Sequence, residues 1–118
     1  MKRDMDLIRT ILMEVEKLPF DGQWHTLKFS DRSQDEVCYH VLLAQEAGLL
    51  EARHLKGTAE FMVNRLTYQG HEFLDAARED TLWNKAKDRV RSTTGTLTLE
   101  AMKTALALLM KQALTGGM

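Results

Sequence analysis

The segment from His40 to Leu50, HVLLAQEAGLL, constrains the fold more than any other part of the chain. It predicts the end of a helix, a stop at Gly48 and the start of a strand, because glycine readily supplies the left-handed residue that ends a helix. Upstream of it, Ser33 and Glu36 have the spacing of a capping box. The helix is therefore predicted to run from Gln34 to about Ala47.

Two strands are predicted directly after this helix. The first covers residues 49–54 and the second covers residues 61–66, with a turn centred on Gly57 between them. Side chains of a strand alternate between its two faces. One face of the second strand should carry Phe61, Val63 and Arg65, and the other should carry Met62, Asn64 and Leu66. The pattern from residue 34 to residue 66 thus predicts a helix followed by a β-hairpin.

The segment before this helix predicts a first helix and a short strand. The helix should run from Asp4, which can cap it, to about Lys17, and the only proline, Pro19, follows it. Residues 24–29 alternate imperfectly between apolar and polar side chains. We interpret them as a short strand.

Three more helices are predicted in the second half of the chain. Thr67 is expected to cap one that runs to about Asp80. Asp80 or Thr81 should cap the next, in which Trp83 lies on an apolar stripe against the preceding helix. The last helix is predicted to start near Thr98.

The order helix, strand, helix, hairpin and further helices matches a winged helix-turn-helix domain with additional C-terminal helices. That fold is α+β and mainly helical. We expect the winged-helix domain over residues 1–80, and a helical extension that serves as a dimerisation element over residues 81–118. In such a domain the helix before the hairpin is the recognition helix, and the hairpin is the wing.

Three stretches of the chain resemble an uncharacterised winged-helix family found in bacteria and their prophages. They are MKRDMDLIR at residues 1–9, the segment 36–49 that begins EVCYH and ends AGL, and LTYQGHEFLD continuing to DTLWNKAK over residues 66–87. The resemblance covers most of the chain. It implies a winged-helix fold and a bacterial or phage origin, and it implies no activity. Residues 40–50 also resemble, over a shorter length, the recognition segment of metal- and ligand-responsive repressors.

Six residues are candidates for contact with double-stranded DNA. They are Gln34, Tyr39 and Gln45 on the predicted recognition helix and Arg53, His54 and Lys56 on the predicted wing. Amide, phenol and basic groups can hydrogen-bond to base edges or phosphates. This set predicts a small, non-enzymatic DNA-binding or regulatory protein that acts as a dimer.

The distribution of charge supports a rival hypothesis. The net charge is −1, and the helix over residues 34–47 contains no Lys or Arg but carries Asp35, Glu36 and Glu46, which phosphates repel. The alternative is a protein-interaction adaptor that uses the same fold without nucleic acid and binds another protein through Tyr39, Leu42 and the last helix. A switch that holds a small molecule between the last helix and the winged-helix domain is a third hypothesis.

The last helix carries an apolar seam whose members are spaced alternately by three and four residues. The seam consists of Leu99, Met102, Leu106, Leu109 and Ala113. It lasts about two heptads, and so short a helix is not stable alone. The seam predicts a homodimer, with packing on the first helix of the same chain as the alternative.

Patterns typical of catalysis, metal binding and membrane insertion are missing from the sequence. The single cysteine, Cys38, excludes an intrachain disulfide and fits a reducing compartment, and its spacing of two from His40 does not place both on one helix face. Gly48, Gly57 and Gly70 are explained by a helix stop, a turn and close helix packing rather than by a phosphate-binding loop. No apolar run approaches the roughly 18 residues of a membrane span, and the N-terminus lacks a signal-peptide pattern. We expect no enzyme, no cofactor and no metal, and a cytoplasmic location.

Overall fold

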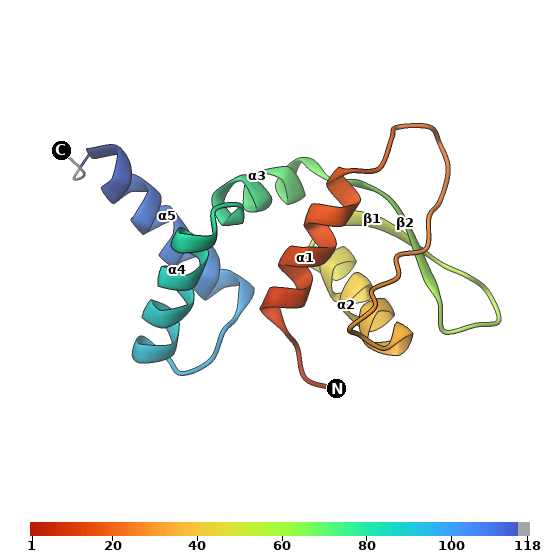
Figure 1. Ribbon diagram of the computed structural model, residues 1–118, viewed down its shortest axis with the longest axis horizontal. Helices are drawn as coiled ribbons and strands as arrows, with labels where there is room; N and C mark the ends of the chain where they lie inside the picture. The colour runs from red at the N-terminus through yellow and green to blue at the C-terminus, as the bar shows by residue number, and fades with distance from the viewer. Residues whose placement is uncertain (116–118) are drawn as a thin grey trace. The chain divides into compact units, whose positions relative to one another are not determined.

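The computed structural model describes residues 1–115 as an α+β, mainly helical fold with five α-helices and one two-stranded antiparallel sheet (Figure 1). The predicted fold class is confirmed at that level. The backbone divides into two compact units, Met1–Glu72 and Phe73–Met118. The boundary predicted after residue 80 stays a prediction. No helix within residues 1–115 combines the length and the apolar character needed to cross a lipid bilayer.

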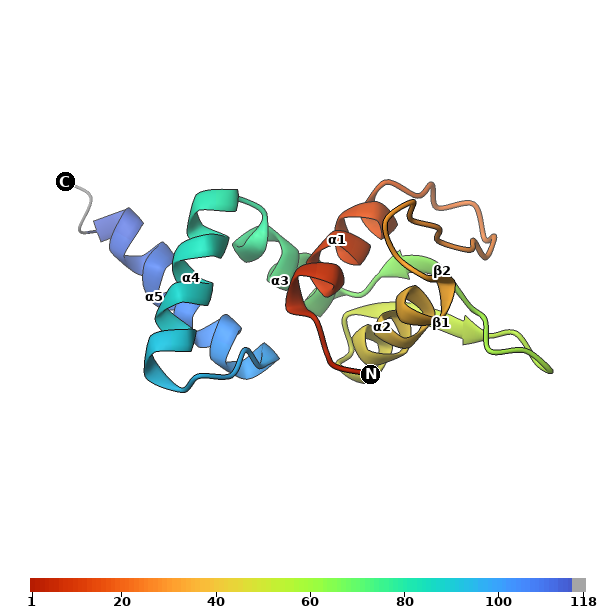
Figure 2. The same cartoon turned by 60° about the horizontal axis from the view of Figure 1, so that its bottom comes forward.

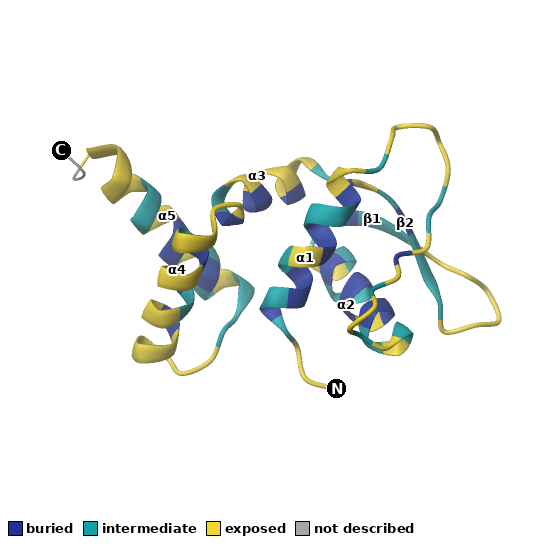
Figure 3. Cartoon of the chain, in the orientation of Figure 1, coloured by how far each residue is buried: buried dark blue, intermediate teal, exposed yellow. Residues whose placement is uncertain are grey.

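The first unit is built on helix α1 (Met5–Glu16), which begins where its sequence predicts. The Asp4 carboxylate accepts the N–H groups of Asp6 (2.9 Å) and Leu7 (3.2 Å), which a helix N-terminus leaves without partners. The buried stripe of α1 (Figure 3) consists of Met5, Leu7, Ile8, Ile11, Leu12 and Val15. Through this side α1 packs on helix α2 (Gln34–Glu46) and on strand β2 (Phe61–Leu66).

Helix α2 ends at the predicted glycine stop. Gly48 has φ +76°, a conformation that L side chains rarely adopt, and the next N–H, that of Leu49, donates to the Ala44 carbonyl at 2.9 Å. Strand β1 (Leu50–His54) follows at once and pairs antiparallel with β2. Figure 2 shows α2 lying against this hairpin, and α2 contacts both of its strands. The predicted helix, stop and hairpin are confirmed.

A β-bulge makes the predicted alternation along β2 wrong. Ala52 lies opposite Val63 and Glu51 lies opposite Arg65, so Asn64 has no opposite residue on β1. One extra residue reverses the facing of the side chains that follow it. Val63 and Leu66 are consequently both buried, at 0% and 2% exposure.

The predicted strand over residues 24–29 is wrong in its extent. Only His25 pairs with a strand: its N–H donates to the Val63 carbonyl and its carbonyl accepts the Val63 N–H, both at 2.8 Å. Further along, the Leu27 carbonyl accepts the side-chain amide of Gln34 at 3.0 Å. The chain therefore turns toward the start of α2 instead of continuing along β2.

Helix α3 (Tyr68–Ala77) begins against the backbone that follows α2. Thr67 caps it as predicted, because its hydroxyl accepts the Gly70 N–H at 3.0 Å. The same hydroxyl donates to the Gly48 carbonyl, and the Thr67 N–H donates to the Leu49 carbonyl at 3.1 Å. A Cβ at Gly70 would lie 1.8 Å from the Leu49 carbonyl oxygen, so this approach requires glycine. The close packing predicted at Gly70 is thus confirmed, and the atoms that Gly70 approaches belong to the backbone of Leu49.

The second unit contains helix α4 (Asp80–Thr93), whose cap differs from the prediction. The Glu79 carboxylate accepts the N–H groups of Thr81 (3.1 Å) and Leu82 (2.8 Å). The predicted cap at Asp80 or Thr81 is wrong, because the longer Glu79 side chain reaches both free N–H groups from one residue earlier.

Helix α5 (Leu99–Thr115) packs on α4 in the second unit. It starts at the predicted position, where the Thr98 hydroxyl accepts the Ala101 N–H at 3.1 Å.

Trp83 of α4 is 1% exposed and meets the Phe73 ring edge-to-face, with 6.2 Å between ring centroids. The predicted core position of Trp83 is confirmed.

Candidate functional site

Helix α2 has one buried side and one side that faces solvent. Its buried residues are Val37, Cys38, His40, Val41 and Ala44. Asp35, Tyr39 and Glu46 are exposed and Leu42 is half-buried, at successive spacings of four, three and four residues. This spacing places the four side chains on one face. We call these four residues the α2 face.

Two of the predicted DNA-contacting side chains on α2 are engaged within the chain. The Gln34 amide donates to the Leu27 carbonyl at 3.0 Å and lies 3.6 Å from the Cys38 sulfur. The Gln45 amide donates to the Ala52 carbonyl at 2.7 Å. Both side chains are half-buried, whereas Tyr39 is 38% exposed. Among the three predicted helix contacts, Tyr39 is therefore the one that is open to a partner.

A network of ion pairs at the start of α2 includes Arg32, which was not among the candidate residues of the sequence analysis. The Ser33 hydroxyl accepts the Glu36 N–H at 3.1 Å, as the capping box predicts. The Glu36 carboxylate, however, pairs with Arg32 at 3.1 Å, and the same guanidinium pairs with Asp4 at 2.9 Å. The spacing of four between Arg32 and Glu36 was the available signal. Because Arg32 is committed to two carboxylates, the start of α2 offers no free cation to a phosphate.

This network predicts a defined loss of stability in acid. Burial raises the pKa of Asp4, but hydrogen bonds from Arg32 and from the N–H groups of Leu7 and Asp6 outweigh it and hold this pKa below its ordinary value of 3.8. Asp4 therefore stabilises the fold above pH 3.8, and the stabilisation is lost as the pH falls through the lowered pKa.

We expect Arg32→Met to lower the free energy of unfolding by about 1 kcal/mol at pH 7, since the pair is partly exposed. Urea titrations at several pH values should show a shallower decline below pH 5 for this variant than for the parent chain. Lys17→Met breaks an exposed pair with Glu14 and is the matched control, with an expected change below about 0.5 kcal/mol. Parallel pH curves for Arg32→Met and the parent would contradict this role of Arg32.

The hairpin carries the three predicted wing residues, all of which are exposed. The Arg53 guanidinium carbon lies 6.0 Å from the centre of the Trp24 ring, within the range of a cation–π contact. The His54 ring bonds the Thr58 carbonyl across the turn. Lys56 lies at the exposed turn, and the Arg65 charge is paired with Glu51 at 2.9 Å. Arg65 is exposed as well, so Arg53 and Lys56 differ from it in that the charge of Arg65 is already paired with Glu51.

The predicted dimer seam of α5 is partly covered within the chain. Met102 and Leu106 are fully buried, Leu99 and Leu109 are half-buried, and Ala113 is exposed. Buried side chains leave no area for a partner, so the seam cannot act as a unit while α5 packs as described. The homodimer itself stays a prediction.

His40 occupies a buried structural position on α2. It is fully buried, its Nε2 accepts the Asp4 N–H at 2.8 Å, and its Nδ1 lies 2.8 Å from the Glu36 carbonyl. Through these two hydrogen bonds the ring of His40 ties α2 to the start of α1.

Within residues 1–115, no three His, Cys, Asp or Glu side chains lie close enough to hold one metal ion.

Comparison with known proteins gives the chain a family. The model of a family of hypothetical proteins, DUF2513, matches residues 2–96. The chain belongs to this family. An uncharacterized protein of Haemophilus influenzae is 38% identical over 117 residues, which span 97% of this chain and 99% of the relative. No solved structure matches the chain significantly. The predicted membership of an uncharacterised family is confirmed.

The DUF2513 match includes the α2 face and the hairpin and ends before α5 begins. Over the first unit, residues 1–72, the sequence has nine Lys and Arg residues against twelve Asp and Glu residues. The part of the chain that carries the candidate site is therefore acidic overall. The α2 face itself carries two exposed carboxylates, Asp35 and Glu46, beside an exposed tyrosine and a half-buried leucine.

Proposed function

We propose that this member of the DUF2513 family is a non-enzymatic regulatory module that docks its α2 face on another protein. The architecture we assign to it is a winged helix, in a protein of bacterial or phage origin. The hairpin directly after α2 supports this architecture, and so does the His25 bridge to the edge of β2 that β1 leaves free. Residues 17–33 depart from it, because they join α1 to α2 without the short turn of a helix-turn-helix.

The composition of the α2 face is the observation that carries this proposal. Asp35 and Glu46 lie at its two ends, Tyr39 and Leu42 lie between them, and α2 contains no Lys or Arg. Phosphates would meet only the negative charge of these carboxylates there. The neutral amides of Gln34 and Gln45 are already bonded to backbone carbonyls within the chain. A protein surface with an apolar centre and flanking Lys or Arg would complement the α2 face in apolar contact and in charge.

Double-stranded DNA bound through the hairpin is the second candidate, favoured by the exposed Arg53 and Lys56. Fluorescence anisotropy with a labelled random-sequence duplex at about 50 mM salt separates the two, because low salt strengthens every phosphate contact. The expected result is no saturable change at about 100 μM protein, which equals the weakest dissociation constants usual for non-specific binding at physiological salt and exceeds those expected at this lower salt. Binding that is lost in an Arg53→Ala and Lys56→Ala double variant would replace the first proposal with the second.

The docking proposal also predicts which substitution removes a protein partner. A Leu42→Glu bait should retain a specific partner at least tenfold less well than the parent chain, because a charge replaces an apolar anchor at the centre of the α2 face. Lys28→Ala, an exposed change in the same unit, is the matched control and should retain the partner fully. The partner is then titrated in purified form against all three chains, and circular dichroism verifies that each is folded. Equal affinity for the Leu42→Glu variant and the parent would refute docking through the α2 face.

A further inference from the structure

Helix α5 contains a segment that is apolar on every side. Residues 105–110 read ALALLM, six apolar residues in succession, which cover more than one full turn of a helix. Ala105 and Leu106 are buried, while Ala107 and Leu108 are exposed. A surface helix normally has a polar outer face, and a helix that is apolar all round is normally buried. The packing of α5 on α4 therefore leaves part of this segment uncovered.

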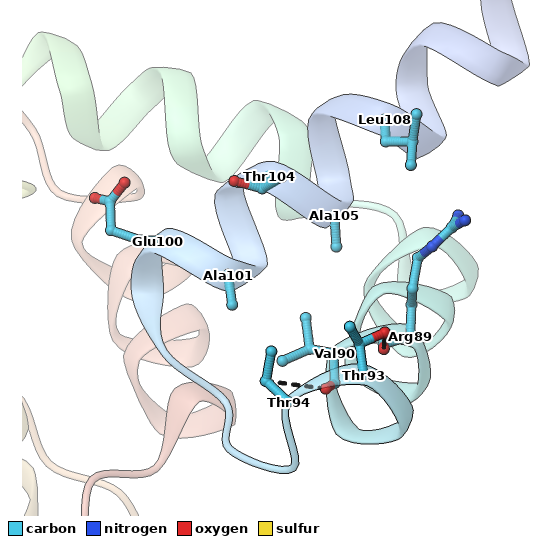
Figure 4. A pocket seen from close by; sticks show the side chains of 9 residues that line it. All are labelled: Arg89, Val90, Thr93, Thr94, Glu100, Ala101, Thr104, Ala105 and Leu108. Atoms are coloured by element: carbon cyan, nitrogen blue, oxygen red, sulfur yellow. Dashed lines mark hydrogen bonds between the residues drawn. The ribbon is translucent and has the colours of Figure 1, made fainter.

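A groove of about 370 Å³ lies between α5 and the end of α4, and the exposed Leu108 is among the residues that line it. Its floor is formed by Val90 of α4 and by Ala101, Ala105 and Leu108 of α5 (Figure 4). The second unit, which contains this groove, spans only 46 residues of the chain. Units of this size bury only a modest fraction of their surface, so further contacts add markedly to their stability.

Opposite charges lie at the two ends of the groove. Figure 4 shows Glu100 at one end and Arg89 at the other, on opposite sides of the apolar floor. Glu100 lies 3.6 Å from Lys103 of the same helix, but its side chain is 84% exposed and stays accessible to a second cation. A twofold axis that crosses the groove at right angles reverses the order of residues in the second copy, so that residue i of each copy meets residue j of the other. In that arrangement Arg89 of each copy lies against Glu100 of the other, whereas an axis along the groove would place Arg89 against Arg89 and is disfavoured by charge.

We infer that the α4–α5 groove is the surface through which two copies of this chain form a homodimer. Two helical hairpins facing groove to groove form a four-helix bundle, which buries Leu108, the exposed leucine of the apolar segment that lines the groove. This surface differs from the predicted seam, of which Met102 and Leu106 lie inside the chain. A lipid surface fits less well, because membrane-surface helices carry many basic residues on their polar face, and α5 has Lys103 and Lys111 together with Glu100.

Charge reversal across the twofold axis provides the test. The oligomeric state of the full chain is measured by sedimentation velocity from about 1 to 100 μM, where we expect a dimer. Arg89→Glu and Glu100→Lys should each raise the dimer dissociation constant about tenfold, since each creates two like-charge contacts in a homodimer. Lys85→Glu reverses an exposed charge of α4 that does not line the groove, and it should leave the dissociation constant unchanged.

An equimolar mixture of the Arg89→Glu and Glu100→Lys chains should form a heterodimer about as tight as the parent dimer, because both cross-axis contacts then join opposite charges. Native mass spectrometry of the mixture separates this species from the two homodimers. Leu108→Lys should yield a monomer with an unchanged circular dichroism spectrum, since Leu108 is exposed in the single chain. A parent chain that is monomeric at 100 μM, one that instead binds anionic vesicles, or a mixture no tighter than either single variant would overturn the inference.

Discussion

Replacing Gly70 with alanine is expected to lower the free energy of unfolding by about 3 kcal/mol or more. The added Cβ would lie 1.8 Å from the carbonyl oxygen of Leu49 and 2.8 Å from its carbonyl carbon. The Leu49 backbone cannot move aside easily, because its N–H donates to Ala44 at 2.9 Å and its carbonyl accepts the Thr67 N–H at 3.1 Å. Relief of the clash therefore requires the start of α3 to separate from the end of α2. Urea unfolding followed by circular dichroism measures the loss.

Gly57→Ala is the control that separates this clash from backbone strain. Gly57 has φ +83° and a Cβ there would have nothing within 4 Å, so the substitution meets only the unfavourable left-handed conformation. That conformation costs about 1 to 2 kcal/mol for an L residue. A Gly70→Ala loss no larger than the Gly57→Ala loss would show that the approach of α3 to Leu49 is not tight.

Features set by neighbours in the sequence were predictable, and features set by distant neighbours were not. Asp4, Ser33 and Thr67 act as predicted because a cap bonds to N–H groups two or three residues away. The stop at Gly48 is similarly local. The bulge at Asn64 depends on how two strands align, and no pattern within β2 alone determines it.

The candidate site shows the same division. The sequence correctly shows that α2 lacks basic residues and carries Tyr39 and Leu42, and these facts support the proposed docking surface. It assigned Gln34 and Gln45 to DNA because an amide can bond a base edge, but an amide bonds a backbone carbonyl equally well. Which acceptor is nearest depends on where the Leu27 and Ala52 carbonyls lie after folding. The predicted seam of α5 has the same limit, since periodicity identifies an apolar side but not the helix that covers it.

His40→Phe is expected to lower the free energy of unfolding by about 2 to 3 kcal/mol, although it preserves a buried ring. The Asp4 N–H donates to His40 Nε2 at 2.8 Å, and phenylalanine would leave this donor unpaired next to the cap of α1. The Glu36 carbonyl loses less, because it lies within α2. Urea unfolding measures the loss, and His71→Phe, at an exposed position, is the control with an expected change below about 0.5 kcal/mol.

A spectroscopic measurement tests the cause of the His40 effect independently of its size. A ring nitrogen that accepts an N–H carries no proton, so the neutral ring must hold its proton on Nδ1 and donate it to the Glu36 carbonyl, 2.8 Å away. The ¹⁵N chemical shifts of His40 should therefore identify this tautomer, which is the less common one for an exposed neutral histidine. The opposite tautomer would place two donors face to face at Asp4, and the destabilisation of His40→Phe would then have to come from packing alone.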